Sequence, residues 1–329
     1  MPLRPPVAAA AAVAVVLVIA PATAFASAAG DPPAPGHRNV IVLTGYWPPS
    51  NEMLRPFSAN PELNPDGWIG ANWENRGFDV HAYFPEFADP DCTSCGRGFG
   101  DLEVDYQDTS ADFWPIMDGH EPVAIVTFSR TNAPLTWEVE QNTFNADSWV
   151  NDYAFPFQPT PSPPDGSVPA DFLRTSTLPM QGIVDAVNGS GLGLDAFICV
   201  SQSAGSFLSG FIAYHGLWYQ SIHASPADPA RCVAAGHVHV GRLIPWNVAH
   251  EATKVTLREV IDHVVGIVGA GPADVDVDGT VGFGDLVSVL GAWGGCPAPP
   301  AACPDDVDGS GTVDLDDVLA VLAAWGATP

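Results

Sequence analysis

The sequence predicts an α/β domain with a mostly parallel sheet and helices on both faces, in three layers, followed by a small all-α module. Between residues 37 and 268, apolar runs of strand length alternate with segments of helical period. After residue 273, a pattern rich in Asp and Gly occurs twice. With 329 residues, 47% of them hydrophobic, the chain can form one sizeable core and one small module.

The strands are expected at residues 39–44, 78–83, 122–128, 195–200 and 234–240, and the helices at residues 177–188, 203–219 and 250–265. In such a fold, functional sites lie at the carboxyl ends of the strands. The Pro-rich segment 158–169 cannot form regular structure and is expected to be a loop over that edge.

The charge of the chain excludes some partners. It has 11 Lys and Arg against 38 Asp and Glu, for a formal net charge of -27. Phosphate groups would be repelled by this surface, so neither a nucleic acid nor an anionic membrane is expected as a partner.

Residues 1–29 have the pattern of a secretory signal peptide. Arg4 precedes an apolar run over residues 7–20, and small residues in A-x-A spacing follow. The alternative is a membrane anchor, but the run is shorter than the roughly 20 apolar residues that a span requires. We therefore expect the protein to be secreted, extracellular or at the cell surface.

Export favours disulfides among the six cysteines. Cys92 and Cys95 form a lone CxxC in a Gly- and Asp-rich loop, and a local disulfide is expected there. Cys296 and Cys303 bracket the Pro-rich stretch CPAPPAAC and are expected to be a second disulfide. Cys199 and Cys232 are either a pair or two unrelated buried thiols.

The stretch FICVSQSAGSFLSG is the first candidate for a nucleophile. A strand followed by SQSAG and a helix is similar to a nucleophile elbow, although Ser201 replaces the first Gly. In that interpretation Ser203 attacks, and Asp228 with His239 or His250 completes a triad, as in a serine esterase. The alternative is that Ser203 is a helix N-cap.

Five stretches in order resemble pyroglutamyl peptidase I (pyrrolidone-carboxylate peptidase): VLTGYWPPSN, LTWEVEQNTFN, STLPMQGIVDAV, VSQSAGSFLSGFIAYH and AAGHVHV. The corresponding family motifs are TGFxPFGG, ExxxxN, STLP, SxxAGxxxC and GFIHVP. The resemblance covers roughly residues 40–265. It implies a phosphorylase/hydrolase-like α/β fold and hydrolysis of a peptide or small amide.

Carried over residue by residue, the resemblance places the catalytic His at His239, the Glu at Glu140 and the nucleophilic Cys at Ser209, with Glu138 a competitor for Glu140. A serine hydroxyl needs a general base during attack, whereas a thiol can be ionised beforehand. The change therefore implies altered or lost activity. Each residue also has a structural alternative. His239 could be a core histidine, Glu140 a solvated carboxylate at a strand edge, and Ser209 a packing residue within the helix.

The first strand departs from the family as well. The Phe of TGF is Tyr46, and the later PFGG is PPSN at residues 48–51. Both changes would alter the apolar pocket and loop that hold a pyroglutamyl ring in the family.

The C-terminal repeat predicts two calcium sites. The stretches DVDVDGTVGFGDLVSVLGAWG and DVDGSGTVDLDDVLAVLAAWG align without a gap at an offset of 32 residues, from Asp274 to Asp306. Loop positions 1, 3, 5, 7 and 12 supply oxygen ligands for calcium. The expected ligands are Asp274, Asp276, Asp278, Thr280 and Asp285 in the first loop, and Asp306, Asp308, Ser310, Thr312 and Asp317 in the second.

Residues 273–326, within a C-terminal domain 273–329, resemble a type I dockerin, because an aspartate closes each loop and one helix follows it. The resemblance implies a cohesin-like partner, read at residues 283–284 and 315–316. Two functions thus follow from the sequence: a secreted hydrolase attached through a dockerin, or a catalytically inactive binding or assembly module on the same peptidase fold.

Overall fold

The structure, a computed structural model, describes residues 39–90, 92, 95–200, 204–225, 228, 230–268, 273–276, 281–296, 303 and 305–326. The predicted signal peptide, residues 1–29, lies outside these ranges. No helix in the described ranges combines the length and the apolar character needed to cross a membrane.

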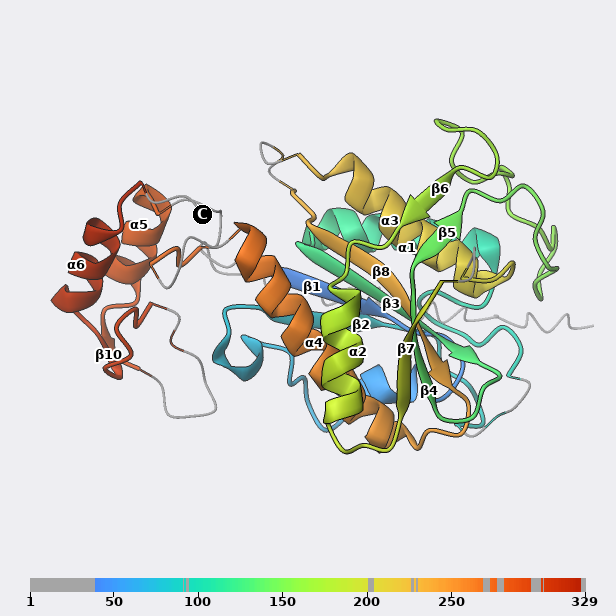
Figure 1. The fold of residues 1–329 in the computed structure, drawn as a ribbon, viewed down its shortest axis with the longest axis horizontal. Helices are drawn as coiled ribbons and strands as arrows, with labels where there is room; N and C mark the ends of the chain where they lie inside the picture. Colours follow the sequence, from blue (N-terminus) through green and yellow to red (C-terminus); the bar gives the residue numbers. More distant parts are fainter. Residues whose placement is uncertain are drawn as a thin grey trace, which may run out of the picture. The chain divides into compact units, whose positions relative to one another are not determined.

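A six-stranded sheet forms the centre of residues 39–268 (Figure 1). Its order is β2 (Asp79–Tyr83), β1 (Val40–Thr44), β3 (Ala124–Thr131), β8 (Ala234–Gly241), β4 (Thr136–Glu140) and β7 (Asp195–Cys199). Neighbouring strands are parallel except at the β4–β8 pair, which is antiparallel. The predicted α/β class with a mostly parallel sheet is therefore confirmed.

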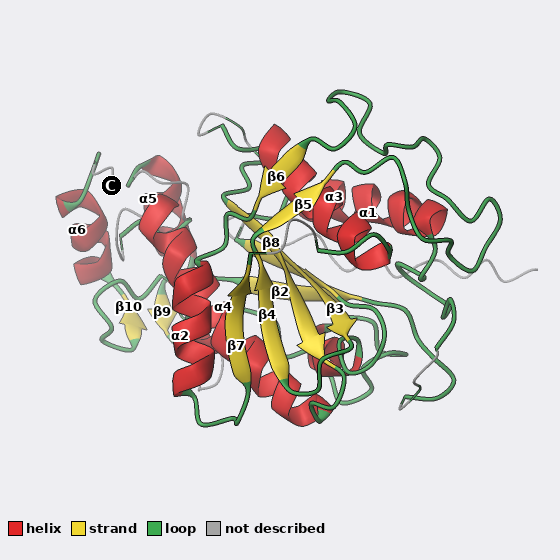
Figure 2. Cartoon of the chain, turned by 45° about the vertical axis from the view of Figure 1, so that its right-hand side comes forward, coloured by secondary structure: helices red, strands yellow, loops and turns green. Residues whose placement is uncertain are grey.

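Helices cover both faces of this sheet (Figure 2). On one face, α1 (Tyr106–His120) and α3 (Leu208–Ile222) pack on the side chains of Val42 and Ile125. On the other face lie α2 (Met180–Gly189), α4 (Trp246–Val268) and the 3-10 helix η1 (Glu52–Phe57). The two apolar clusters are separated by the sheet, which gives the three predicted layers.

Two elements near the site, α1 and β4, were not expected from the sequence. Helix α1 contains Pro115 and polar residues that obscure its period, but its N-terminus is capped by Asp105, whose side chain accepts hydrogen bonds from the amides of Gln107 and Asp108. Strand β4 alternates buried Trp137 and Val139 with Glu138. The short strands β5 (Asn142–Phe144) and β6 (Leu173–Thr175) form a separate antiparallel pair, and η2 (Trp73–Asn75) is a further 3-10 turn.

Segment 158–169 is without regular structure, as expected. Asp165 holds it in place, because this fully buried carboxylate accepts hydrogen bonds from Arg174 (2.8 Å) and from the hydroxyl of Tyr214 (3.0 Å) on α3. The loop is therefore anchored to the same helix that begins at Leu208.

Residues 273–326 contain α5 (Phe283–Gly291) and α6 (Leu315–Ala323), with a short antiparallel pair of β9 (Gly294–Gly295) and β10 (Thr312–Val313). Their small core consists of Ala273, Val275, Val281, Val289, Val313 and Val321. The expected disulfides, Cys92–Cys95 and Cys296–Cys303, are both present, whereas Cys199 and Cys232 form no disulfide.

Candidate functional site

A histidine and a carboxylate meet on the face of the sheet that α3 covers. Nδ1 of His239 on β8 lies 2.7 Å from Oε1 of Glu140 at the end of β4. In the antiparallel register Glu138 is opposite His239, and Glu140 is opposite His237. The contact between Glu140 and His239 is therefore one between diagonal neighbours on the two strands. The Glu140 side chain is only 4% exposed, which removes the competition of water for this hydrogen bond.

The two carboxylate oxygens of Glu140 differ in their hydrogen-bond partners. Within the described residues, Oε2 is buried without a hydrogen-bond partner. A buried carboxylate oxygen without a donor is costly, so this atom marks a place where a donor from water or a ligand would stabilise the site.

Glu138 has a different partner. Its Oε1 accepts a hydrogen bond of 2.7 Å from the hydroxyl of Thr136 on the same strand. Of the two glutamates that the sequence left open, Glu140 is the one in contact with His239. The ligand atoms of Glu138, Glu140 and His239 do lie within 4.8 Å of one another, a spacing that would also suit a divalent cation.

His237 is a buried neighbour of His239 on the same strand, β8. Its ring is buried, with Nδ1 at 2.8 Å from the Thr127 hydroxyl and Nε2 at 2.8 Å from the Ser129 hydroxyl. Burial, and next the proximity of His239, hold the pKa of His237 well below its usual value. A neutral His237 adds no positive charge beside His239, whose ring centroid is 4.7 Å away.

Ser209 is the second residue of α3, and therefore lies in its first turn. Ser209 is half-buried there, and the alternative of a packing residue within the helix stays open. The first intrahelical bond of α3 runs from the Phe211 amide to the Phe207 carbonyl, so the preceding amides, including that of Ser209, have no intrahelical acceptor. Such a helix start favours developing negative charge.

The backbone before α3 bends closely around this serine. Gly205 has a φ of +98°, and a Cβ at that position would lie 3.1 Å from the Ser209 hydroxyl oxygen. Glycine therefore provides both the left-handed conformation and the space for the hydroxyl. Among the described residues no hydrogen bond joins Ser209 to His239; the structure places both on the same face of the sheet through β8 and α3.

The elbow interpretation of Ser203 stays a prediction, because Ser203 lies outside the described residues. Strand β7 ends at Cys199 and α3 begins at Leu208. The N-cap of α3 is Phe207, so the alternative that Ser203 caps this helix is wrong.

The other members of that predicted triad have separate partners. Asp228 lies 3.0 Å from Nδ1 of His223, and Nδ1 of His250 lies 2.8 Å from the Met53 carbonyl oxygen. Neither residue contacts His239, because each is held by its own loop or helix.

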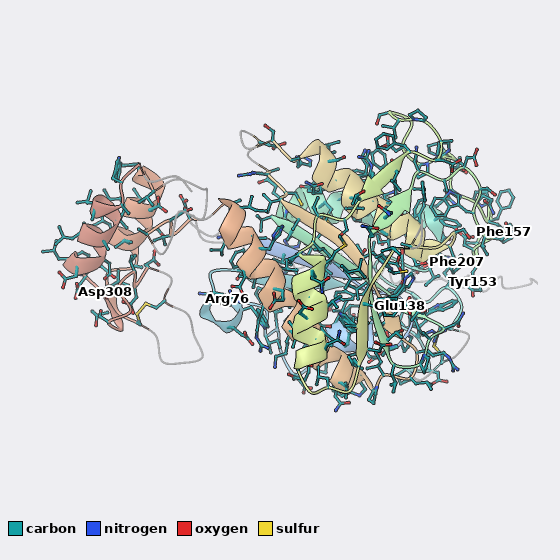
Figure 3. The ribbon with its side chains drawn as sticks, viewed as in Figure 1. Arg76, Glu138, Tyr153, Phe157, Phe207 and Asp308 are labelled. Carbon is teal, nitrogen blue, oxygen red and sulfur yellow. A yellow bond between two sulfur atoms is a disulfide. The ribbon has the colours of Figure 1, made fainter. Side chains whose placement is uncertain are left out.

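Aromatic side chains form a wall beside the start of α3. The rings of Trp47, Tyr153 and Phe207 have centroid separations of 6.1 to 6.3 Å, and Figure 3 shows Tyr153 and Phe207 close together. Since Phe207 is the N-cap residue of α3, this wall is two residues from Ser209. No local pattern in the sequence indicates this wall, because its members come from three separate loops.

Tyr46, which stands where the motif TGFxPFGG has its first Phe, is part of the core. Its hydroxyl is 2.8 Å from that of Thr109 on α1, and burial raises its pKa well above the usual value. Ser50 and Asn51 of the same loop are also fully buried. This loop is therefore a rigid support, tied by hydrogen bonds to α1 and to the chain around Pro85.

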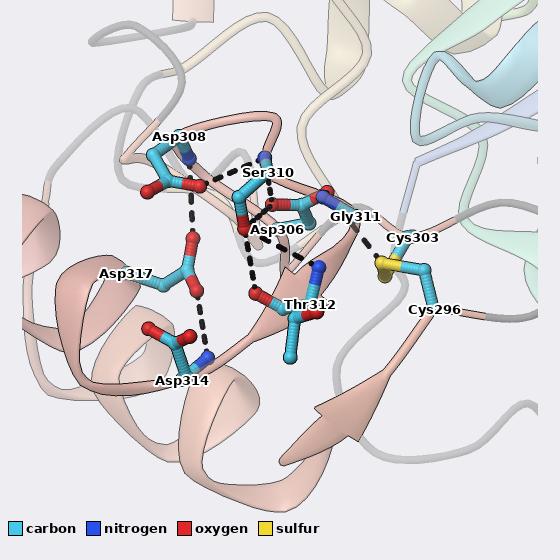
Figure 4. Close-up of a disulfide and its surroundings, with 9 residues drawn as sticks. All are labelled: Cys296, Cys303, Asp306, Asp308, Ser310, Gly311, Thr312, Asp314 and Asp317. Atoms are coloured by element: carbon cyan, nitrogen blue, oxygen red, sulfur yellow. Dashed lines mark hydrogen bonds between the residues drawn. A yellow bond between two sulfur atoms is a disulfide. The ribbon is translucent and has the colours of Figure 1, made fainter.

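The closing aspartates of the two acidic loops in the C-terminal part make matching hydrogen bonds. In the first, the carboxylate of Asp285 accepts hydrogen bonds from the amides of Asp276 (3.1 Å) and Gly282 (2.6 Å). In the second, Asp317 accepts them from Asp308 (3.1 Å) and Asp314 (2.8 Å), as Figure 4 shows. The closing aspartates are 1% and 0% exposed, so each is buried at the start of its helix.

Three carboxylates converge in each loop. Ligand atoms of Asp274, Asp276 and Asp285 lie within 4.8 Å of one another, as do those of Asp306, Asp308 and Asp317. Ser310 and Thr312 lie beside the second group, joined by a 3.1 Å hydrogen bond from the Ser310 hydroxyl to the Thr312 carbonyl. The other two expected ligands, Asp278 and Thr280, lie outside the described residues.

The helices after these loops, and the residues just beyond them, expose matching apolar side chains. Four pairs, each separated by 32 positions (as 315 is from 283), are between 47% and 72% exposed: Phe283 and Leu315, Val287 and Leu319, Leu290 and Leu322, Trp293 and Trp325. The first three residues of each repeat have the spacing of one side of a helix, and the tryptophan follows the end of that helix.

No protein-family model matches the chain, and no curated protein matches its sequence. Similar solved structures include a pyrrolidone carboxyl peptidase from Thermococcus litoralis, with 16% identity and a TM-score of 0.49 over 69% of this chain and 96% of that chain. Pyroglutamyl peptidase I from Bacillus amyloliquefaciens has 15% identity and a TM-score of 0.47 over 68% and 98% of the two chains. At these identities the activity of this chain has to be argued from its own side chains.

Proposed function

We propose that residues 37–268 form a hydrolase of amide or peptide bonds of the pyroglutamyl-peptidase type, with His239 as the base, Glu140 as its orienting carboxylate and Ser209 as the nucleophile. The observation that carries this proposal is the 2.7 Å contact between His239 and the buried Glu140. A carboxylate at Nδ1 holds a neutral imidazole in the tautomer whose Nε2 can accept a proton.

In the proposed reaction, the Ser209 hydroxyl oxygen attacks the carbonyl carbon of the substrate while Nε2 of His239 takes the hydroxyl proton. Glu140 stabilises the imidazolium that forms. The amides at the start of α3 stabilise the oxyanion. His239 then returns the proton to the leaving amine as the carbon–nitrogen bond breaks, and water, activated by the same histidine, hydrolyses the acyl ester on Ser209.

Two features support this use of the site over a metal centre at Glu138, Glu140 and His239. Glu140 and His239 are already joined by a direct hydrogen bond, and Glu138 is engaged by Thr136. The serine on the same face lies in a helix start rather than in the helix interior, where it would only pack.

The test is turnover of a fluorogenic pyroglutamyl amide by the mature chain and by Ser209→Ala, Ser209→Cys and Ser203→Ala. Activity lost only in Ser209→Ala supports the proposal, and activity lost only in Ser203→Ala would contradict it. If the wild type is silent and Ser209→Cys is active, the scaffold has lost its nucleophile. If all four are silent across a broad amide panel, an inactive binding module is the better description.

We also propose that residues 273–329 bind two calcium ions in a dockerin-like arrangement. The donor set is oxygen only, and buried Asp285 and Asp317 would be hard to accommodate beside two further carboxylates without a cation. Bound calcium would neutralise these charges and join each loop to its helix. A titration of the chelated full chain with calcium should raise its melting temperature; no change at excess calcium would contradict this proposal.

The exposed apolar residues of α5 and α6 support a protein partner of the cohesin type for this part. Exposed apolar patches on a soluble chain often mark interaction sites, and here the patch is duplicated with the repeat. The two disulfides support an exported, secreted or surface-attached protein. A pull-down with a panel of cohesin domains, with and without a chelator, tests the attachment separately from the hydrolase.

A further inference from the structure

A pocket lies beyond the carboxyl ends of β1, β3 and β8. It has a volume of about 1070 Å³ and is bordered by Pro48 and Pro49 after β1, Asn132 after β3, and residues 242–244 after β8. The carboxyl ends of parallel strands are where α/β folds place ligand sites. None of the residues proposed for catalysis borders this pocket.

The pocket brings together two of the few basic side chains of a very acidic protein. Arg130 and Arg242 both border it, and the chain has only 11 Lys and Arg against 38 acidic residues. Among the described residues on its border, Glu52 is the acidic one, and both of its carboxylate oxygens accept hydrogen bonds from Arg55, at 2.8 Å and 3.1 Å.

The positions of both arginines are set by the backbone. Nη1 of Arg130 donates to the carbonyl of Cys92 at 2.9 Å, and Nε of Arg242 donates to the carbonyl of Asn132 at 3.0 Å. Burial, and then the positive charge of Arg242, lower the pKa of Arg130. Because both guanidinium groups border the pocket, an anion within it would be attracted by both.

The N-terminus of α4 is a further feature that favours an anion in this pocket. Trp246 and Asn247, the first residues of the helix, border the pocket. The first amides of a helix have no intrahelical acceptor and carry partial positive charge. The two arginines and this helix start are independent features that favour the same kind of ligand.

The pocket is linked to the proposed catalytic region through one aromatic ring. The Arg130 guanidinium lies 4.9 Å from the ring centroid of Trp47. The same Trp47 contacts Phe207, the N-cap residue of α3. A short extended ligand could therefore reach from the start of α3, along the aromatic wall, to the arginines.

We propose that the pocket bordered by Arg130 and Arg242 binds the carboxylate of an organic ligand, and that in the hydrolase this is the free carboxyl end of a short peptide substrate. The first part stands independently, and the second rests on the proposed function. A carboxylate is favoured because guanidinium groups bind it through paired hydrogen bonds. Leu243, Ile244 and Trp246 give the pocket an apolar border that suits an organic ligand rather than a small hydrated anion.

Binding is tested first without catalysis. The full mature chain carrying His239→Ala is titrated by calorimetry with N-acetyl-leucyl-phenylalanine and with its carboxyl-terminal amide, which differ only in the negative charge. We expect the acid to bind about tenfold or more tightly than the amide, as is usual for a charged hydrogen-bonded pair. Equal affinities would overturn the proposal.

The arginine is then tested directly. Arg242→Gln should reduce the affinity for the acid to that for the amide and leave the amide unchanged. Arg242 is exposed, so this variant is expected to fold. The matched control is Arg76→Gln, at an arginine paired with Asp262 and not on the border of the pocket. An Arg242→Gln variant that keeps its preference for the acid would overturn the proposal, as would inorganic phosphate that binds as tightly as the acid.

The link to the hydrolase is measured with His239 restored. On a peptide substrate with a free carboxyl end, Arg242→Gln should raise KM about tenfold with little change in kcat, whereas the amidated substrate should be unaffected. A selective KM effect supports the substrate assignment, and no effect overturns it. If the chain with His239 restored shows no turnover of any substrate, the proposed hydrolase is contradicted. The calorimetry still tests whether the pocket binds a carboxylate.

Discussion

Oε1 of Glu140 and Nδ1 of His239 lie 2.7 Å apart across the only antiparallel junction in the central sheet of the described residues, between β4 and β8. Because β4 runs against β8, the two residues are diagonal neighbours on the face under α3. The register of this strand pair therefore determines that Glu140 is the carboxylate that hydrogen-bonds to His239.

Glu140→Gln tests that relationship. The amide keeps the size of the side chain but cannot stabilise an imidazolium, so kcat on an active substrate should fall on the order of a hundredfold or more. Glu138→Gln is the matched control, since Glu138 lies on the same strand and contacts Thr136 instead. A larger loss in Glu138→Gln than in Glu140→Gln would show that the roles are reversed.

Gly210→Ala should damage the start of α3. A Cβ at Gly210 would lie 1.9 Å from the carbonyl oxygen of Gly205, so the loop before Ser209 has to move. We expect a loss of about 1–3 kcal/mol in the free energy of unfolding, measured by denaturant titration. In contrast, Gly119→Ala near the end of α1 meets open space and should stabilise the protein by about 0.5–1 kcal/mol. Equal effects of the two substitutions would argue against this packing.

Asp317→Asn should remove the second calcium site and leave the first. Asp317 is buried and closes its loop, so the change should weaken calcium binding at that site by about tenfold or more in calorimetry. Asp285→Asn should do the same at the first site. The exposed Asp316 is the control, because its neutralisation lowers the charge without removing a ligand. Two intact sites in Asp317→Asn would contradict the assignment.

Buried His215 on α3 predicts a pH dependence of stability. Its Nδ1 is 2.9 Å from the Phe211 carbonyl oxygen, and burial lowers its pKa to about 4. The unfolded chain binds a proton at about pH 6.5, whereas the folded chain binds it only near pH 4, so unfolding takes up a proton between these values. The free energy of unfolding should therefore fall as the pH drops through this window, by at most about 3 kcal/mol from this residue.

His215→Gln should remove that proton uptake, as measured from the slope of unfolding free energy against pH. Ser110→Ala is the control, because it removes the hydroxyl 3.3 Å from Nε2 and keeps the imidazole. An unchanged slope in His215→Gln would mean that other groups account for the acid sensitivity.

Much of the fold was predictable, for local reasons. The apolar runs at residues 39–44, 195–200 and 234–240 became β1, β7 and β8, because strand cores are encoded in consecutive residues. Helix α1 was missed because Pro115 and the polar residues around it interrupt the helical period. Strand β4 has the alternation of a half-buried strand, so the sequence did hold a signal for it.

The sequence by itself determined the duplicated acidic loops at an offset of 32 residues, the order of the strand and helix segments, and the small set of residues from which a catalytic group could be drawn. These are properties of spacing along the chain. Only the tertiary structure decided that Glu140 rather than Glu138 contacts His239, that Ser209 lies at a helix start, and that Arg130 and Arg242 share a pocket. Each of these depends on the register of β4 against β8 or on the meeting of separate loops, and no local pattern encodes such contacts.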